Sequence, residues 1–185
     1  MSKLVLIIGA NGSGKSTVMR NIIGEESETF VHRLGGKYTV SKKRKLIALG
    51  KYDNQCGGCD GIKTTFLVYN MVDALSKEYP DYDIYFEGIL ISGIFANVAK
   101  LLMEMLFEHK RDVYVCLLYT NSLTSVTRVL SRNGGKNINQ AGIVDRVDGS
   151  QTAFRKHREL GLYNCKAFDS INVPASEIAY QILSL

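Results

Sequence analysis

The chain has 185 residues, 45% of them hydrophobic, four cysteines and a formal net charge of +5 at pH 7. No apolar stretch is long enough to span a bilayer, and the apolar run after residue 3 is too short for a secretory signal, so we expect a cytoplasmic protein without a membrane span. This size and the lack of a linker-like stretch predict a single domain over 1–185 with reduced thiols, and the charge favours a polyanionic partner.

The first predicted strand, 4–8, runs directly into a phosphate-binding motif. Residues 9–16 read G-A-N-G-S-G-K-S and match the pattern G-x-x-x-x-G-K-[ST], and an amphipathic helix is predicted at 16–23. In such a loop, backbone N–H groups wrap the phosphates, the lysine reaches the β- and γ-phosphates, and the hydroxyl ligates magnesium. We therefore expect a nucleoside triphosphate to be bound by Gly9, Asn11, Gly12, Ser13, Gly14, Lys15, Ser16 and Thr17, with Lys15 also catalytic.

Two further strands are predicted at 29–34 and 47–49, separated by turn material that includes Gly35-Gly36 and a basic run. The basic run is Lys42-Lys43-Arg44-Lys45. It has two interpretations, either the solvated tip of a hairpin or a contact with a phosphate backbone, and the sequence favours neither.

The segment 50–62 is polar, rich in glycine and placed directly after a strand, which suits an acceptor-binding loop. Asp53 and Asp60 are candidates for the base that accepts a proton from a substrate hydroxyl, with Asp60 the first choice; either could instead cap a turn or the next helix. Cys56 and Cys59 have a C-x-x-C spacing. Because further ligands at zinc spacing are missing from the sequence, we interpret them as packing residues of the loop.

The rest of the chain alternates helices with unbroken apolar strands. Helices are predicted at 64–78, 94–109, from a cap at Ser122 or Thr124 to 132, 151–159 and 174–183, and strands at 83–86, 112–118 and 165–171. Strands of this kind are covered on both faces of a parallel sheet. We therefore predict an α/β fold, a three-layer sandwich around a five-stranded, mainly parallel sheet.

Glu87 follows the predicted strand 83–86 and precedes a glycine. Its carboxylate is expected at the sheet edge where ligands bind in open α/β folds, close enough to hold magnesium together with Ser16. The alternative is an exposed glutamate at a strand end.

Arg128 and Arg132 are four residues apart on a predicted helix and therefore share one face. They precede a polar, glycine-containing segment with Lys136, so the region 124–160 is expected to form a lid that brings cations to the transferring phosphoryl group. The further candidates are Arg146, Arg155, Lys156 and Arg158, for which a solvated basic helix is the alternative, and His157 is expected at the surface.

With these motifs placed, the whole chain resembles small P-loop kinases of the adenylate-kinase-like superfamily. The resemblance implies five parallel strands, a small lid, and ATP and Mg²⁺ as cosubstrates. The segments Gly50-Lys51-Tyr52-Asp53 and Gly57-Gly58-Cys59-Asp60 resemble phage 5-hydroxymethyluridine DNA kinases. That resemblance implies phosphorylation of the hydroxymethyl group of modified thymine bases in DNA, within the host cytoplasm.

Two other functions stay open at this point. The same sequence features would also suffice for a soluble deoxynucleotide or other small-molecule kinase if the basic run is only a solvated hairpin. The D-R-[YHS] signature typical of thymidylate and deoxynucleoside kinases is, however, missing after the Glu87 strand. A nucleotide-binding switch without transfer activity is disfavoured, because N-K-x-D is absent and D-x-x-G is absent at the expected distance.

Overall fold

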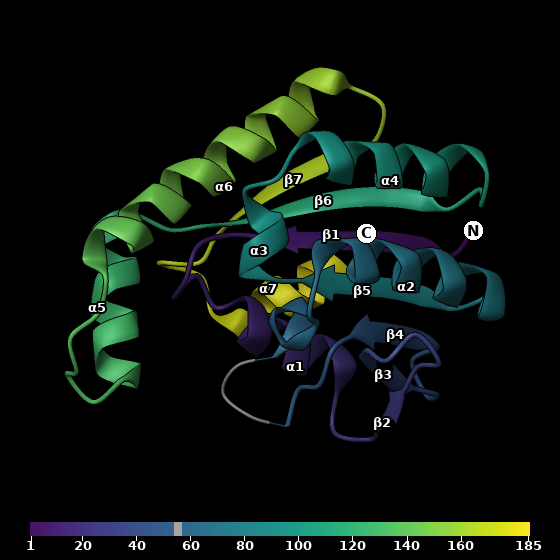
Figure 1. Ribbon diagram of the computed structural model, residues 1–185, viewed down its shortest axis with the longest axis horizontal. Helices are drawn as coiled ribbons and strands as arrows, with labels where there is room; N and C mark the ends of the chain where they lie inside the picture. The colour runs from purple at the N-terminus through teal and green to yellow at the C-terminus, as the bar shows by residue number, and fades with distance from the viewer. Residues whose placement is uncertain (54–56) are drawn as a thin grey trace.

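The structure is a computed structural model that describes residues 1–53 and 57–185. Within these residues one sheet of seven strands has the order β2-β3-β4-β5-β1-β6-β7 (Figure 1). The strands are β1 Lys3–Ile8, β2 Glu28–Val31, β3 Lys37–Ser41, β4 Leu46–Leu49, β5 Asp83–Glu87, β6 Asp112–Tyr119 and β7 Asn164–Asp169. The helices are α1 Lys15–Ile23, the 3₁₀ helix η1 Gly58–Gly61, α2 Thr65–Glu78, α3 Ile89–Ser92, α4 Ala96–Phe107, α5 Ser122–Arg132, α6 Gln140–Leu160 and α7 Ala175–Leu183.

The five strands β4, β5, β1, β6 and β7 pair in parallel, which confirms the predicted parallel core. β1 lies in the middle of these five, so the phosphate-binding motif emerges at the centre of the sheet edge where the strands end. Among the described helices, none has the length and apolar character needed to cross a membrane.

The number of strands differs from the prediction, because β2 and β3 extend the sheet by two antiparallel strands. The segment of β3 was expected to be part of the connection between the predicted strands 29–34 and 47–49. The turns expected at Gly35-Gly36 and at the basic run are present, and β3 lies between them. Its sequence, K-Y-T-V-S, alternates and favours a strand, and Tyr38 and Val40 are buried against the core. Short strands with a glycine pair on one side and a basic run on the other are hard to separate from their turns.

Successive side chains of β1 point to opposite faces of the sheet, and helices cover both faces, which gives three layers. Leu4, Leu6 and Ile8 point to the face covered by α2 and α4, whereas Val5 and Ile7 point to the face covered by α1 and α7. All five side chains are buried. A strand with two buried faces reads as an unbroken apolar run, which is why the sequence predicted this layered arrangement.

The helix predicted at 94–109 is confirmed as α4, and a short helix that the sequence did not predict, α3, precedes it. α3 is a single turn directly after β5, and Gly93 separates it from α4. Further along, α5 is capped by Asn121, whose Oδ1 accepts a hydrogen bond of 2.8 Å from the Thr124 N–H, rather than by Ser122 or Thr124. Asparagine is as good a helix cap as serine or threonine, so the sequence left the choice open.

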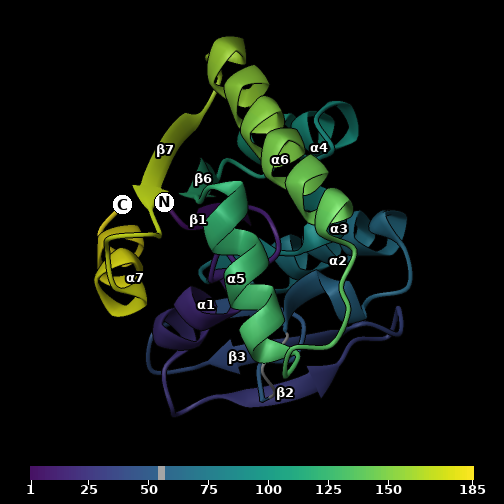
Figure 2. The same cartoon turned by 90° about the vertical axis from the view of Figure 1, so that its left-hand side faces the viewer.

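The largest correction concerns α6, which begins at Gln140 and not near 151. The segment that looked like a polar connection is therefore the first half of a helix of 21 residues. Ile143, Val147, Ser150 and Phe154 form its buried stripe at helical spacing. Because packing supplies most of a helix's stability in proteins, the stripe outweighs the two glycines of this segment. Figure 2 shows α5 and the beginning of α6 beyond the ends of the parallel strands.

Candidate active site

The phosphate-binding motif forms a loop between β1 and α1 whose backbone only glycine adopts readily. Gly12 and Gly14 have φ angles of 77° and 88°, in the left-handed region. The loop turns into α1 at Gly14, whose carbonyl accepts a 3.0 Å hydrogen bond from the Thr17 N–H. The amino-terminal end of α1, with its partial positive charge, therefore faces the space above the loop.

Lys15 is almost fully buried within this loop. Its Nζ donates hydrogen bonds to the carbonyl oxygens of Gly9, at 2.7 Å, and Ala10, at 3.0 Å. Burial lowers the pKa of the Lys15 ammonium from its usual value, although the nearby Glu87 acts in the opposite direction. A buried ammonium next to a helix start is well suited to hold a phosphate group.

Ser16 and Glu87 meet across the edge of the sheet. The Ser16 hydroxyl donates a 2.9 Å hydrogen bond to Glu87 Oε1, and Glu87 is only 1% exposed. Burial raises the pKa of Glu87 to about 7, against the effects of Lys15 and the Ser16 hydroxyl, which lower it. A hydroxyl and a buried carboxylate side by side form an oxygen-donor set that fits Mg²⁺. The strand-end glutamate is thus buried and faces the motif.

A cavity of about 1090 Å³ opens above the loop. Single small-molecule sites usually measure about 300–1,000 Å³, so this cavity has room for a nucleotide together with part of a second substrate. Ser13 Oγ is buried at its floor and has no hydrogen-bond partner within the described residues. Such a group in a polar cradle fits a bound phosphate.

One side of the cavity is formed by α5 and by the connection between β7 and α7. Arg128 donates hydrogen bonds to the carbonyl oxygens of Gly12, at 3.2 Å, and Ser170, at 2.8 Å. The lining continues along this connection with Ser170, Ile171, Asn172, Val173, Pro174 and Ala175. These residues were not among the site residues predicted from the sequence. The rule that ligands bind where parallel strands end would have indicated them.

Arg132 also lines the cavity, as its spacing from Arg128 predicted. Arg146 reaches the loop from α6, where its guanidinium donates a 3.0 Å hydrogen bond to Asn11 Oδ1. Arg155 and Lys156 instead contact Thr152 and the ring of Phe95. Among the candidate cations of the predicted lid, those that approach the phosphate-binding loop therefore come from α5 and the first half of α6, and Arg20 of α1 lines the same cavity.

The two candidate aspartates of the loop lie in different surroundings. Asp60 lines the main cavity, and its Oδ1 accepts a 2.7 Å hydrogen bond from the Ile89 N–H at the start of α3. Asp53 lines a second cavity of about 720 Å³ between α1 and the antiparallel strands. An ion pair with Lys51 lowers the pKa of Asp53. Thr64, not an aspartate, caps α2.

Two glycines allow the described part of this loop to pack against the end of β5. A Cβ atom at Gly58, where φ is +78°, would lie 2.4 Å from Glu87 Oε1. A Cβ atom at Gly50, where φ is +100°, would lie 2.2 Å from the Gly58 carbonyl oxygen. Any side chain at either position would separate the loop from Glu87. The close approach also brings η1, and Asp60 with it, to the cavity.

The predicted packing role of Cys59 agrees with its burial, which raises the pKa of the thiol well above its usual value. Cys56 lies outside the described residues.

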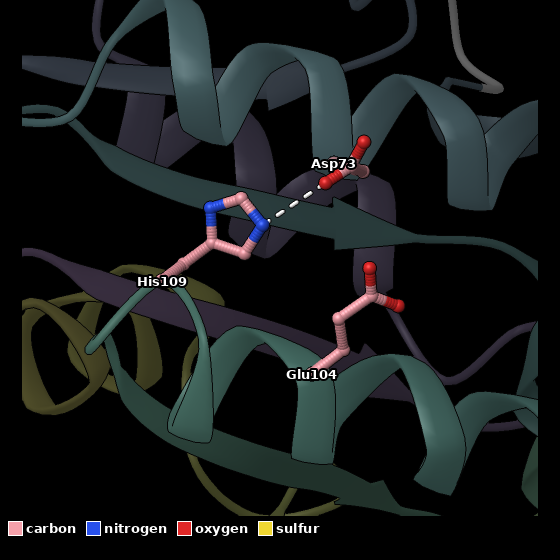
Figure 3. Close-up of side chains that lie close together, drawn as sticks. All are labelled: Asp73, Glu104 and His109. Atoms are coloured by element: carbon pink, nitrogen blue, oxygen red, sulfur yellow. Dashed lines mark hydrogen bonds and ion pairs between the residues drawn. The ribbon is translucent and has the colours of Figure 1, made fainter.

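In the part of the chain that the structure describes, the one cluster that brings three metal-ligand side chains together is Asp73, Glu104 and His109 (Figure 3). Asp73 already bonds His109 Nε2 at 2.9 Å and Lys77 at 2.8 Å, so this cluster is an ion-pair network that joins α2 to the end of α4.

The basic run has contacts within the protein. Arg44 donates to the Asn21 carbonyl oxygen at 2.7 Å and also to that of Ile22, at the carboxyl end of α1. Lys43 forms a 3.1 Å ion pair with Glu26. These contacts fit the hairpin interpretation for Lys43 and Arg44, because a cation at a helix carboxyl end neutralises unpaired carbonyl groups.

His157 corrects a prediction, since it is buried and not at the surface. Its ring lies at an angle to the ring of Phe95, and its Nδ1 shares a hydrogen bond with the Tyr163 hydroxyl. Burial lowers the pKa of His157 to about 4. Charged neighbours along α6 hid the fact that position 157 continues the buried stripe of the helix.

Comparisons with known proteins match this arrangement to one family. The family model described as "5-hmdU DNA kinase" matches residues 1–176. "5-hmdU DNA kinase 1" of Salmonella phage ViI is 32% identical over 162 residues, which cover 85% of this chain and 72% of the relative. "5-hmdU DNA kinase" of Pseudomonas phage PaMx11 is 28% identical over 182 residues, covering 95% and 89%. A solved structure of deoxyadenosine kinase from M. mycoides aligns with a TM-score of 0.46 and 16% identity, covering 98% of this chain and 97% of that chain.

Proposed function

We propose that this chain, which belongs to the 5-hmdU DNA kinase family and is a phosphotransferase, transfers the γ-phosphoryl group of ATP to the hydroxymethyl oxygen of 5-hydroxymethyluracil in DNA. The family assignment supports ATP as donor and a nucleotide-type acceptor. The observation that carries the proposal is a single cavity that contains the phosphate-binding loop, the Ser16–Glu87 pair and Asp60. It allows donor and acceptor groups to meet within one site.

On the donor side, the glycine backbone and the amino-terminal end of α1 would hold the phosphates, with Lys15 at the β- and γ-phosphates. The polar floor at Ser13 and the left-handed glycines fit this group. Ser16 and Glu87 would hold Mg²⁺, which supplies charge neutralisation at the phosphate oxygens. Ionised Glu87 is needed for that task, and Lys15 and Ser16 favour the ionised form.

On the acceptor side, Asp60 would accept the proton of the attacking hydroxymethyl group. The hydroxymethyl oxygen forms a bond to the γ-phosphorus while the bond from that phosphorus to the bridging oxygen breaks, and ADP leaves with the electron pair. The hydrogen bond from the Ile89 N–H fixes the Asp60 carboxylate at the cavity wall. Asp53 is proposed to have no part in this proton transfer, since it lies in the second cavity with Lys51.

The cations of the lid would stabilise charge on the transferring group. Arg132 lines the cavity, and Arg146 is hydrogen-bonded to Asn11 within the phosphate-binding loop. Charge on the three γ-phosphoryl oxygens persists through the transition state, so guanidinium groups aimed at them accelerate transfer. Arg128, held by two backbone carbonyls, would form the side wall of the nucleotide site.

The experiment that tests the proposal uses ATP labelled at the γ-phosphate and three acceptors. These are a duplex with one 5-hydroxymethyluracil, the same duplex with thymine, and the free 5-hydroxymethyluracil nucleotide. We expect label to enter only the modified duplex. Label in the thymine duplex would mean transfer to an end or sugar hydroxyl and would contradict the proposal.

A soluble deoxynucleotide kinase is the second candidate. It is favoured by one observation, that Lys43 and Arg44 of the basic run have partners within the protein and so give less support to a DNA contact there. Label that enters the free nucleotide but neither duplex would establish this function in place of the first. No label in any acceptor, with slow ATP hydrolysis alone, would remove both kinase proposals.

A further inference from the structure

Two large apolar side chains are exposed on α2 and α3, the helices that follow Asp60 and Glu87 in the chain. Phe66, in the first turn of α2, is 71% exposed, and Leu90, in α3, is 51% exposed. Their neighbours Val68 and Ile91 are buried in the core, so the two exposed side chains are not required for packing. Single exposed apolar residues are common, but two of them beside a substrate cavity indicate contact with a partner.

Leu90 is tied to the cavity through the residue before it. Ile89 lines the cavity, and its N–H is the group that holds Asp60. Leu90 is therefore one residue away from the wall at which the acceptor hydroxyl is proposed to react. Its side chain is exposed and directly follows a residue of the cavity wall, and we call this edge of the site the rim.

Phe66 follows the proposed acceptor segment closely in the chain. It lies in the first turn of α2, and only residues 62–64 separate α2 from η1, which carries Asp60. η1 packs against Gly88, the residue directly before α3. Figures 1 and 2 both show α3 beside the beginning of α2, the turn to which Phe66 belongs.

The charges around this rim complement a polyanion. Lys63, just before the cap of α2, is exposed, and Lys156 lies 6.0 Å from the ring centroid of Phe95, between α3 and α4. The segment 120–160 contributes most of the chain's excess positive charge, and all its Lys and Arg side chains are exposed. Apolar side chains between exposed cations are the pattern expected where nucleic acid lies on a protein.

We propose that Phe66 and Leu90 form a wedge that enters the DNA beside the extruded acceptor base and takes the place of its stacking contacts. This inference rests on the proposed function. A base within a duplex hides its hydroxymethyl group from the γ-phosphate, so the nucleotide must leave the stack before transfer. Apolar side chains inserted between base steps are a known way to stabilise such unstacked DNA. Lys63 and the lid cations would hold the flanking phosphates.

The test compares Phe66→Ala with a matched control, Tyr180→Ala, which removes an aromatic side chain of similar exposure, 72%, from α7 on the other face of the sheet. The acceptor is a duplex with 5-hydroxymethyluracil next to 2-aminopurine, whose fluorescence rises when the neighbouring base unstacks. For Phe66→Ala we expect about a tenfold lower kcat/KM on the duplex, a smaller loss on the single strand and a weaker fluorescence rise. The KM for ATP should stay unchanged, and Tyr180→Ala should match the wild type.

Equal kcat/KM and equal fluorescence for Phe66→Ala and Tyr180→Ala would overturn the wedge. A change of oligomeric state in Phe66→Ala, measured by analytical ultracentrifugation with DNA kinetics unchanged, would assign the patch to a second copy of the chain and also overturn it. Failure of the proposed function would look different, because the wild-type protein itself would then leave the modified duplex unlabelled.

Discussion

The two sides of the cavity are built in different ways. The proposed donor side consists mainly of consecutive residues, 9–17, which offer backbone N–H groups and the start of α1 to a phosphate. The acceptor side brings together Asp60, Glu87 and Ile89 from two separate segments, and it depends on glycines that let one segment approach the other. A local motif can be recognised from sequence alone, whereas an assembled wall becomes visible only when the chain is folded.

The largest effect is expected on the acceptor side. Asp60→Asn removes the proposed proton acceptor but can keep the hydrogen bond from the Ile89 N–H, so kcat for the modified duplex should fall by about 10²- to 10⁴-fold. Asp53→Asn is the matched control and should stay within about twofold of the wild type. Single-turnover transfer measures both. An equal loss of activity in the two variants would contradict the proposal that Asp60 takes part in proton transfer and Asp53 does not.

On the donor side, Lys15→Ala should lower kcat/KM by roughly 10²- to 10³-fold, because it removes a charge aimed at the transferring phosphoryl group. The fold should persist, since the hydrogen bonds of the lysine go to carbonyl oxygens of its own loop. Circular dichroism checks the fold, and labelled transfer checks the activity. Full activity in Lys15→Ala would argue that this loop does not hold the donor.

Glu87 links the two sides and gives a pH signature. Its pKa is raised to about 7 in the folded chain, so its protonated form stabilises the fold below pH 4.5 and this contribution is lost as the pH rises through 7. In metal-free buffer, the free energy of unfolding of the wild type should therefore fall relative to Glu87→Gln between these pH values, by on the order of 3 kcal/mol. Denaturant unfolding measures this difference.

The proposed metal role of Glu87 gives a second pH dependence. Mg²⁺ binds the ionised carboxylate, so the affinity of the wild type should rise with pH up to about 7. The Glu87→Gln variant should bind more weakly and show little of this rise. Calorimetric titration with ATP present measures both proteins, and identical pH profiles would contradict a metal role for Glu87.

The smallest effect is expected away from both sides. Arg44→Ala should reduce the free energy of unfolding by about 1 kcal/mol, because it removes a cation from the carboxyl end of α1. Lys42→Ala serves as the control from the same basic run. DNA affinity should change little in Arg44→Ala, measured by fluorescence anisotropy. A strong loss of DNA affinity in Arg44→Ala, with unchanged stability, would instead mean that the basic run contacts the DNA.

The sequence predicted the local structure of the proposed donor side well because its signals are local. The motif at 9–16, the strand before it and the helix after it all lie within two dozen residues, and each has a pattern of its own. The parallel core was predictable for a related reason, since strands with two buried faces read as apolar runs. The spacing of Arg128 and Arg132 likewise placed both on one helix face.

The features that escaped prediction depend on contacts between distant segments. The start of α6 is fixed by a buried stripe that outweighs its glycines, and the burial of His157 follows from Phe95 and Tyr163, which lie on other elements. Likewise, Asp53 and Asp60 look alike in sequence. The packing of η1 against β5 places only Asp60 at the main cavity.

The most direct test of the account is the structure of the protein with a non-hydrolysable ATP analogue, Mg²⁺ and an oligonucleotide that contains 5-hydroxymethyluracil. The distance that decides is the one from the hydroxymethyl oxygen to the nearest carboxylate. We predict that this carboxylate is Asp60, at about 3 Å, with the analogue's phosphates on the loop at 9–16. A hydroxymethyl group next to Asp53 in the second cavity, or phosphates bound elsewhere, would contradict the account.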